Sequence, residues 1–360
     1  MNTTKQIPEN KQKRTPKIEG LDFVRSFCAI GIVIYHFYCH SSFNEGFMVQ
    51  NASSRWGDLF VYVFFIVSGL CIYKSNPEVQ LTKFYYKRWR SIFPAFYVAY
   101  LACLMLRLAV MPDDNSDVTT PPYWTVLLTV TGLDGYFLYC IPDFYLLGEW
   151  FLGAIILLYA LYPLVLRLFK KNAELMLLCL LVLSFFVSKS GFFVVAEERN
   201  VICCLTGFVI GMLMGKNVAL LSDKRVVLFS FVLTVFLIIC PALSFLPVII
   251  TTILMSTTLF ITLKYIGGYF SCRKTSALSY PIFLVQHVVI LVLYKFVNTD
   301  NFYVSLVLCL LAIALTVFTA YVLKAVTEKI TSMRASDRLD RYMGYKRNRS
   351  AEEAGREDQG

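Results

Sequence analysis

Two ionisable side chains in the first apolar tract have the types and spacing that chemistry would need. Arg25 and His36 both lie in residues 19–40, eleven residues apart. Eleven residues make about three turns of an α-helix, which places both side chains on one face, about 16 Å apart. Inside a membrane span each would cost about 2.5–3.5 kcal/mol, so each indicates a partner or a function. A fixed cation and an imidazole on one face could bind an anion and act as a base near neutral pH.

Structural roles stay open for both residues. Arg25 could extend to the membrane interface, paired with Asp22, and His36 could make a hydrogen bond within a helix bundle. His36 and His40 are four residues apart, a spacing that a metal site can use. The segment lacks the glutamate of a zincin, however, and no third ligand is near it in sequence. We therefore predict no metal site.

A second group of candidate residues is basic and aromatic. Residues 83–94, which read KFYYKRWRSIFP, carry Lys87, Arg88 and Arg90 among aromatic rings, and we expect them in a cytoplasmic loop. Arginines suit bidentate binding of phosphates, and aromatic rings can stack on an adenine. A basic stretch beside a membrane span commonly contacts anionic lipid, and that alternative stays open.

Further candidates lie in two later tracts. His287 stands about twelve residues into tract 275–297, beside Gln286, which indicates either a polar cavity or a structural hydrogen bond. Glu149 and Trp150 open tract 145–168. Glu149 could orient His36, bind a hydroxyl of a sugar, or stand in water at the interface.

The elements that must position these residues are membrane spans. Of the 360 residues, 57% are hydrophobic and 16% are charged, against roughly 25% charged in a soluble domain. The apolar residues fall in blocks of about 20, the length that crosses a hydrocarbon core of about 30 Å. The net charge of +10 comes from basic residues beside these blocks, which is typical of membrane topology. We expect contact with membrane lipid and no nucleic-acid partner.

The positive-inside rule tests the candidate spans. The apolar tracts cover residues 19–40, 57–74, 92–111, 123–139, 145–168, 173–193, 200–215, 226–243, 246–264, 275–297 and 302–323. If 123–139 does not cross, the basic loops and both basic tails fall on one side. That tract is also interrupted by Gly132, Asp134 and Gly135. We predict an all-α polytopic bundle of about ten spans, with 123–139 as a re-entrant or surface segment and both termini cytoplasmic.

Three regions follow from this topology. Residues 1–18 form a basic cytoplasmic tail, residues 19–325 form the membrane domain, and residues 326–360 form a second cytoplasmic tail. The last twenty residues are charged and poor in apolar side chains, so we expect most of this second tail to be disordered. No internal repeat of the kind found in inverted-repeat transporters is evident.

An ordered set of motifs resembles the acyltransferase-3 family of integral membrane O-acyltransferases. The family has a histidine eleven residues after an arginine in its opening segment, as Arg25 and His36 are, and a Phe-Phe-x-x-Ser-Gly signature, as in Phe64–Gly69. Arg88–Pro94 is similar to its arginine-rich segment that ends in proline. Further segments are similar and follow in the family's order: Trp150–Pro163, Gly207–Gly211 and Ser279–His287. The resemblance covers residues 17 to 325.

The resemblance implies the chemistry of the site. Acyl-CoA, usually acetyl-CoA, is the donor and enters from the cytoplasm; no cofactor is bound permanently. His36 would deprotonate an acceptor hydroxyl or carry the acyl group, and Glu149 would orient it. Four cations are assigned to the CoA phosphates: Arg25, Lys87, Arg88 and Arg90. Three residues are assigned to the acceptor: Trp150, Tyr280 and His287.

The expected product is an O-acylated glycan. The acceptor would be a surface polysaccharide or a lipid-linked oligosaccharide. The protein itself would lie in the cell membrane of a bacterium, and its partners would be proteins of polysaccharide synthesis or export. Two other classes of protein are compatible with these residues. A proton-coupled transporter or flippase could use Arg25, His36 and His287 as a proton path, and a non-catalytic partner of a polysaccharide synthase would need no chemistry.

Overall fold

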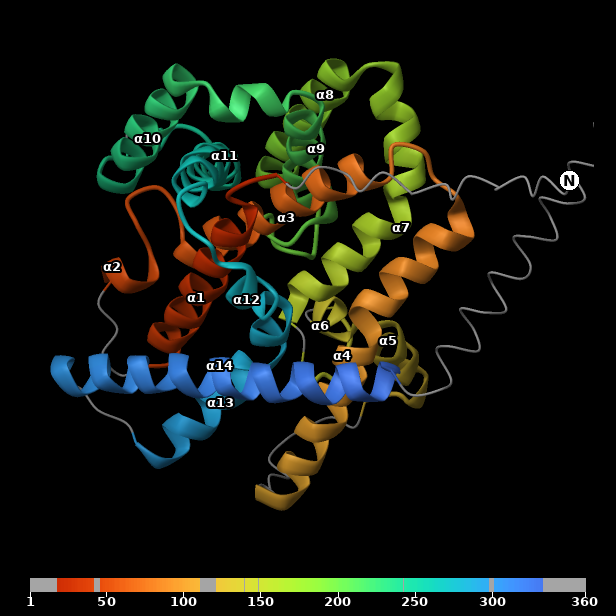
Figure 1. The fold of residues 1–360 in the computed structure, drawn as a ribbon, viewed down its shortest axis with the longest axis vertical. Coiled ribbons are helices and arrows are strands. Elements are labelled where there is room, and N and C mark those ends of the chain that lie inside the picture. The colour runs from red at the N-terminus through yellow and green to blue at the C-terminus, as the bar shows by residue number, and fades with distance from the viewer. Residues whose placement is uncertain are drawn as a thin grey trace, which may run out of the picture.

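The computed structural model of the chain describes residues 18–41, 46–110, 121–138, 140–147, 149–241, 243–297 and 301–332. This part is all-α, as predicted, and its only β pairing is an isolated bridge between Gln50 and Arg55. Each of the ten tracts predicted to span forms one helix (Figure 1). These helices are α1 (Leu21–His40), α3 (Trp56–Ser75), α4 (Leu81–Val110), α7 (Glu149–Lys171), α8 (Ala173–Ser190), α9 (Val201–Lys216), α10 (Lys224–Ile239), α11 (Val248–Gly267), α13 (Ser279–Phe296) and α14 (Phe302–Ser332).

Within the described ranges, eight helices are long and apolar enough to cross a membrane. The two exceptions are α9 and α10, with 16 residues each. At 1.5 Å per residue each measures about 24 Å, less than the hydrocarbon thickness of about 30 Å. Polar caps fix where they begin, since Asn200 accepts a hydrogen bond from the Ile202 N–H and Asp223 accepts one from the Arg225 N–H.

Tract 123–139 does not form a continuous span. It folds into three short helical pieces instead: η1 (Tyr123–Thr125), α5 (Val126–Thr131) and α6 (Asp134–Phe137). Gly132 separates the last two with φ at 69°, a left-handed conformation that favours glycine. Asp134 is 1% exposed, and burial raises the pKa of its carboxyl to about 7. The segment therefore packs against the bundle with a carboxyl group inside it, as a non-spanning element would.

Two helix ends differ from the predicted boundaries. Residues 83–94, expected as a loop, form the first half of α4, which continues through Pro94. Helix α14 runs to Ser332, so residues 326–332 of the region assigned to the C-terminal tail are helical. Helices α4 and α14 both extend past their apolar tracts into polar residues. The length of an apolar tract is therefore a lower bound on the length of the helix that contains it. The remainder of that tail, and residues 1–17, lie outside the described residues.

Helix α1 sets the two ends of the bundle. Its first turn packs on α11, where Gly20 has φ at 85° and leaves no room for a side chain beside the Lys264 carbonyl. Near its other end, the Tyr35 ring packs on Gly57 at the start of α3. Helices α3 and α11 therefore both run antiparallel to α1. We name the two ends of the bundle the Arg25 end and the His40 end.

Helices α3 and α9 pack through glycines. A Cβ atom at Gly69 of α3 would collide with the Phe208 carbonyl, and one at Gly211 of α9 would collide with the Ile66 carbonyl. Gly207 and Gly215 stand four residues to either side of Gly211, so α9 carries small residues at every fourth position. Such spacing lets two helix backbones approach closely in a membrane. This contact fixes α3, which carries part of the site described below.

We expect Gly211→Ala to lower the free energy of unfolding by about 1–3 kcal/mol, because the new methyl group meets backbone rather than a movable side chain. Thermal unfolding of the purified protein in lipid nanodiscs measures the effect. Gly46→Ala in α2 (Gly46–Val49) is the matched control, since nothing lies within 4 Å of a Cβ atom there. Equal melting temperatures for the two variants would contradict the packing role of Gly211.

Candidate functional site

A cavity of about 250 Å³ lies among five helices toward the Arg25 end. Helical spacing directs one face of each helix into it, as with Phe64, Ser68 and Cys71 of α3. The complete lining is Arg25 and Ile32 of α1; Phe64, Val67, Ser68, Cys71 and Ile72 of α3; Arg88, Ser91 and Ile92 of α4; Phe151, Leu152, Ile155 and Tyr159 of α7; and Ser279, Tyr280 and Phe283 of α13. Two arginines from different helices thus meet in a cavity that is otherwise apolar and hydroxyl-bearing.

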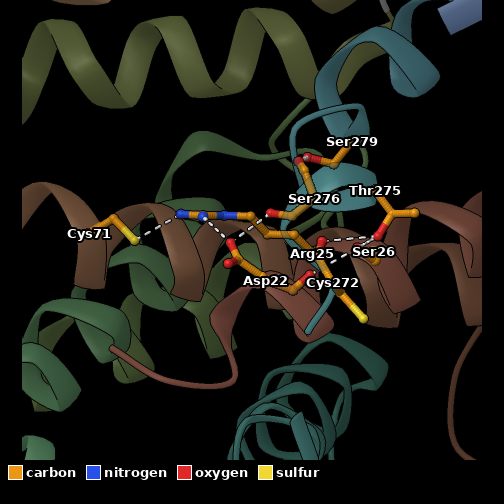
Figure 2. A network of polar contacts seen from close by, with 8 residues as sticks. All are labelled: Asp22, Arg25, Ser26, Cys71, Cys272, Thr275, Ser276 and Ser279. Atoms are coloured by element: carbon orange, nitrogen blue, oxygen red, sulfur yellow. Dashed lines mark hydrogen bonds and ion pairs between the residues drawn. The ribbon is translucent and has the colours of Figure 1, made fainter. Parts of the chain in front are cut away.

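Arg25 is held in place from two sides. Its Nη2 atom donates a hydrogen bond to Cys71 Sγ at 3.0 Å, and its Nη1 atom lies 3.9 Å from Asp22 Oδ1. Ser276 donates to the same carboxylate at 3.0 Å. Figure 2 shows the guanidinium extended between Cys71 on one side and Asp22 with Ser276 on the other. The cation is therefore oriented across the cavity wall, while its side chain stays 31% exposed.

The start of α13 is tied to α1 beside this cation. Ser26 and Thr275 share a hydrogen bond of 2.8 Å, and Thr275 donates to the Cys272 carbonyl at 3.0 Å (Figure 2). Thr275 belongs to α12 (Arg273–Ser276), the short helix that leads into α13. Because α12 is fixed to α1 in this way, Ser279 and Tyr280 keep their position in the lining of the cavity.

Arg88 is the second cation of the cavity. Its guanidinium carbon lies 5.9 Å from the ring centre of Phe84 and 5.7 Å from that of Tyr159. These contacts attract the cation through the ring faces. Its Nε atom is buried and has no hydrogen-bond partner in the described structure. A buried N–H without an acceptor costs about 1–3 kcal/mol, so Arg88 can gain from an anionic ligand.

The four predicted phosphate-binding cations divide into two pairs. Arg25 and Arg88 line the cavity. Lys87 and Arg90, on either side of Arg88 in sequence, are exposed on the surface of α4 and are not part of the lining. Successive residues of a helix point about 100° apart, which is why neighbours in sequence separate in this way.

Three phenylalanines occupy the inner end of the cavity. The ring centres of Phe151 and Phe283 are 5.2 Å apart, and those of Phe64 and Phe151 are 6.1 Å apart. Phe283 stands four residues before His287, and Ile32 four residues before His36. The last lining residues of α1 and α13 therefore stand one helical turn before the two histidines.

All three histidines of the chain lie together toward the His40 end of α1. The ring centres of His36 and His287 are 4.1 Å apart, and those of His40 and His287 are 5.5 Å apart. The structure thus joins two residues that are 251 positions apart in sequence, on α1 and α13. Despite this cluster, no three His, Cys, Asp or Glu side chains of the described residues are placed to share a metal ion.

The other predicted residues have separate places. Tyr280 lines the cavity and donates to the Ile92 carbonyl at 3.0 Å. Trp150 is buried beside Phe65 of α3, with ring centres 6.3 Å apart, and does not line the cavity. Glu149 is the first residue of α7, and its side chain lies outside what the structure describes. The role assigned to Glu149 stays a prediction.

The comparisons with known proteins decide the family. The family model Acyl_transf_3, described as an acyltransferase domain, matches residues 18–324. The chain belongs to the acyltransferase-3 family. Comparison with curated proteins found none that matches, and comparison with solved structures likewise found none. Together with the eight described helices that are long and apolar enough to span, the family identifies a multi-pass membrane acyltransferase.

Sequence reasoning did not assign five polar residues of the cavity wall, which are Ser68, Cys71, Ser91, Tyr159 and Ser279. Two of these, Cys71 and Tyr159, lie against the arginine side chains. Cys71 accepts the hydrogen bond of Arg25, and the hydroxyl of Tyr159 lies near both Ser68 and Arg88. A signal for both exists in the sequence of this acyltransferase. Cys71 follows Phe64 by seven residues, and Tyr159 follows Phe151 by eight, so each shares a helix face with a cavity residue. Projection of each tract on a helical wheel would have found them.

Proposed function

We propose that this acyltransferase moves a short acyl group, acetyl in the first instance, from a CoA thioester to a hydroxyl of a surface polysaccharide or its lipid-linked precursor. One observation carries the proposal: Arg25 and Arg88 meet in one cavity, and this cavity leads toward the pair formed by His36 and His287. A donor with phosphates at one end and a reactive carbonyl at the other suits such an arrangement.

Arg25 and Arg88 would bind the phosphates of CoA. Charge-assisted hydrogen bonds from guanidinium to phosphate are short and strong, and the unpaired Nε of Arg88 supplies one. The hydroxyl of Ser68 lies on the same wall, and those of Ser91 and Ser279, which donate to the Arg88 and Ser276 carbonyls, would have to turn from these acceptors to donate to the ligand. Lys87 and Arg90 stand at the surface, where they would contact lipid headgroups or attract the anionic donor at longer range.

The pantetheine arm would follow α1 from Arg25 to His36, a length of about 16 Å. Phe64, Phe151 and Phe283 line the cavity along this path and would turn aside where the arm needs their space. A ring that yields to a thin chain and then closes around it would keep water from the thioester. This exclusion favours transfer to the acceptor over hydrolysis.

At the end of this path His36 would act as a base. Its imidazole takes the proton of the acceptor hydroxyl while the oxygen attacks the thioester carbonyl. The tetrahedral intermediate then expels CoA as a thiolate, which takes up a proton. In the covalent alternative, the His36 nitrogen attacks the thioester carbonyl and CoA leaves as a thiolate, which takes up a proton; the acceptor oxygen then attacks the acyl-imidazole, loses its proton, and frees the His36 nitrogen. In both routes His287, next to His36, would orient the imidazole or receive its proton.

Charge supports the orientation in the membrane. At the Arg25 end, basic residues cluster at the ends of α3, α7, α9 and α11, at the start of α4 and α10, and in α12. They include Lys74, Lys83, Lys170, Lys171, Lys216, Lys224, Arg225, Arg273 and Lys274. The positive-inside rule places this end in the cytoplasm, where acyl-CoA is made. We propose that both termini face the same side, in the cell membrane.

Family membership favours this function over a proton-coupled transporter, which the buried ionisable residues alone had left open. The test is the chemical composition of the surface polysaccharide. Mass spectrometry of glycan from a strain that lacks the gene should show loss of one O-linked acyl group, restored by the wild-type gene and not by His36→Ala. An unchanged acyl content would contradict the proposed acceptor class.

A further inference from the structure

The side chain of Arg88 lines the cavity that it shares with Arg25, although its basic neighbours on α4 do not. Lys87 and Arg90 are exposed on the surface of the same helix. An arginine near a membrane surface usually extends its charge outward, to water or to lipid phosphates, and leaves only its stem on apolar surface. A contact inside the bundle must therefore oppose this tendency at Arg88.

Two aromatic rings hold this guanidinium from different helices. Its carbon atom lies 5.9 Å from the ring centre of Phe84 and 5.7 Å from that of Tyr159. Both distances lie within the range of about 6 Å over which a ring face attracts a cation. Phe84 stands one turn before Arg88 on the same helix, whereas Tyr159 reaches it from α7. Tyr159 is therefore the ring that ties the cation to the wall formed by α7.

The spacing of residues along α7 brings Tyr159 to this place. Phe151, Ile155 and Tyr159 follow one another at intervals of four residues, and all three line the cavity. The Tyr159 hydroxyl is close enough to Ser68 of α3 and to Arg88 of α4 to interact with both. Three helices therefore meet at this side chain, and their packing sets its position.

Other contacts hold α4 against α7 independently of Tyr159. The Tyr85 hydroxyl donates a hydrogen bond of 2.9 Å to the Ala160 carbonyl. The ring of Phe84 is 2% exposed and stacks on that of Tyr162, with ring centres 5.2 Å apart. Loss of the Tyr159 ring would leave both contacts in place. It would therefore act on the cation rather than on the backbone of α4.

We propose that Tyr159 is a positioning residue for the donor, because its ring keeps the Arg88 guanidinium in the cavity. The inference rests on the proposed function, since it takes CoA as the ligand of this cation. A guanidinium that is held in one orientation presents its N–H groups to a phosphate as a fixed fork. A guanidinium released from the ring would extend to the surface, where lipid phosphates compete for it. Tyr159 thus acts on the donor through Arg88.

Binding of CoA to the full chain in lipid nanodiscs tests this role without catalysis, with isothermal titration calorimetry as the measurement of Kd. Tyr159→Leu removes the ring face, and we expect it to raise the Kd for CoA at least about fivefold, as the loss of a shielded cation–π contact would. Tyr159→Phe keeps the ring and should stay within about twofold of the wild type. Should the leucine variant not fold, Tyr159→Met takes its place, since it fills more of the volume without a ring face.

A double-mutant cycle separates positioning from general packing. In the Arg88→Ala background, Tyr159→Leu should change Kd by less than about twofold, because the cation on which it acts is gone. Tyr97→Leu is the matched control, since Tyr97 does not line the cavity and its hydroxyl donates to the Val130 carbonyl at 2.7 Å. It should lower the melting temperature and leave Kd unchanged. With acetyl-CoA as the donor, Tyr159→Leu should raise KM and leave kcat near the wild-type value.

The outcomes separate this inference from the proposed function. The positioning role is overturned if folded Tyr159→Leu keeps the wild-type Kd, if it raises Kd by the same factor with and without Arg88, or if Tyr97→Leu raises Kd as much. CoA binding and His36-dependent transfer by the wild type would then still support the proposed function. If the wild type does not bind CoA, the proposed donor is wrong and this inference fails with it. If the variants behave as expected but acetyl never leaves CoA, the role of Tyr159 stands and the proposed reaction fails.

Discussion

Replacement of His36 by alanine should lower kcat for acyl transfer by about 100-fold to 10,000-fold, the range that a positioned general base contributes. The lining of the cavity of Arg25 and Arg88 stops one helical turn before His36 on α1, so donor binding should persist in this variant. The expected signature is therefore a large loss of kcat with nearly unchanged KM for acyl-CoA, which indicates an interaction made only in the transition state. Steady-state release of CoA in membranes that contain the acceptor measures both constants.

The other two histidines provide the controls. His40→Ala removes the same side chain one turn along α1, at an exposed position, and should cost less than about tenfold in kcat. His287→Ala should fall between the two, because its ring centre lies 4.1 Å from that of His36. Near-wild-type kcat in a normally folded His36→Ala protein would remove His36 from the mechanism.

Replacement of Arg88 by alanine should raise KM for acyl-CoA by about tenfold or more. A hydrogen bond to a charged group is worth about 1.5–3 kcal/mol, and each 1.4 kcal/mol corresponds to a factor of ten. Arg25→Ala should have an effect of the same size. Arg25→Lys keeps the charge near Asp22 and tests whether the planar guanidinium is needed.

Lys87 and Arg90 are the matched controls for these cations. They flank Arg88 in sequence but are exposed and do not line the cavity, so alanine at either position should change KM by less than about threefold. The contrast between Arg88 and its neighbours is the sharpest form of the test. If all three alanine variants raised KM equally, the donor would bind on the surface of α4 and not in the cavity.

The helices of this site could be predicted from the sequence, and the contacts between those helices could not. Arg25 and His36 could be placed on one face of α1 because the helical repeat relates residues along a single helix. That the ten apolar tracts form helices and that tract 123–139 is broken followed from apolar length and charge in the same way, although eight of these helices, rather than ten, are long and apolar enough to span a membrane within the described residues. These are local properties, and the local sequence contains what is needed to predict them.

Contacts between helices could not be predicted in this way. His287 meets His36 only because α13 packs against α1, and which of Lys87, Arg88 and Arg90 faces inward depends on how α4 is rotated in the bundle. The glycines at every fourth position of α9 are, by contrast, a signal of close helix packing that the sequence itself contains.

The central claim is that this protein takes an acyl group from CoA through His36. The most direct test supplies acetyl-CoA labelled in its acetyl group to purified protein in proteoliposomes that contain lipid-linked glycan extracted from the source membrane. With the wild-type protein we expect the label to leave CoA and to appear on the glycan or on the protein, and we expect His36→Ala to transfer at least about 100-fold less. Label that stays on CoA with the wild-type protein, or transfer that is equal in the two proteins, would contradict it.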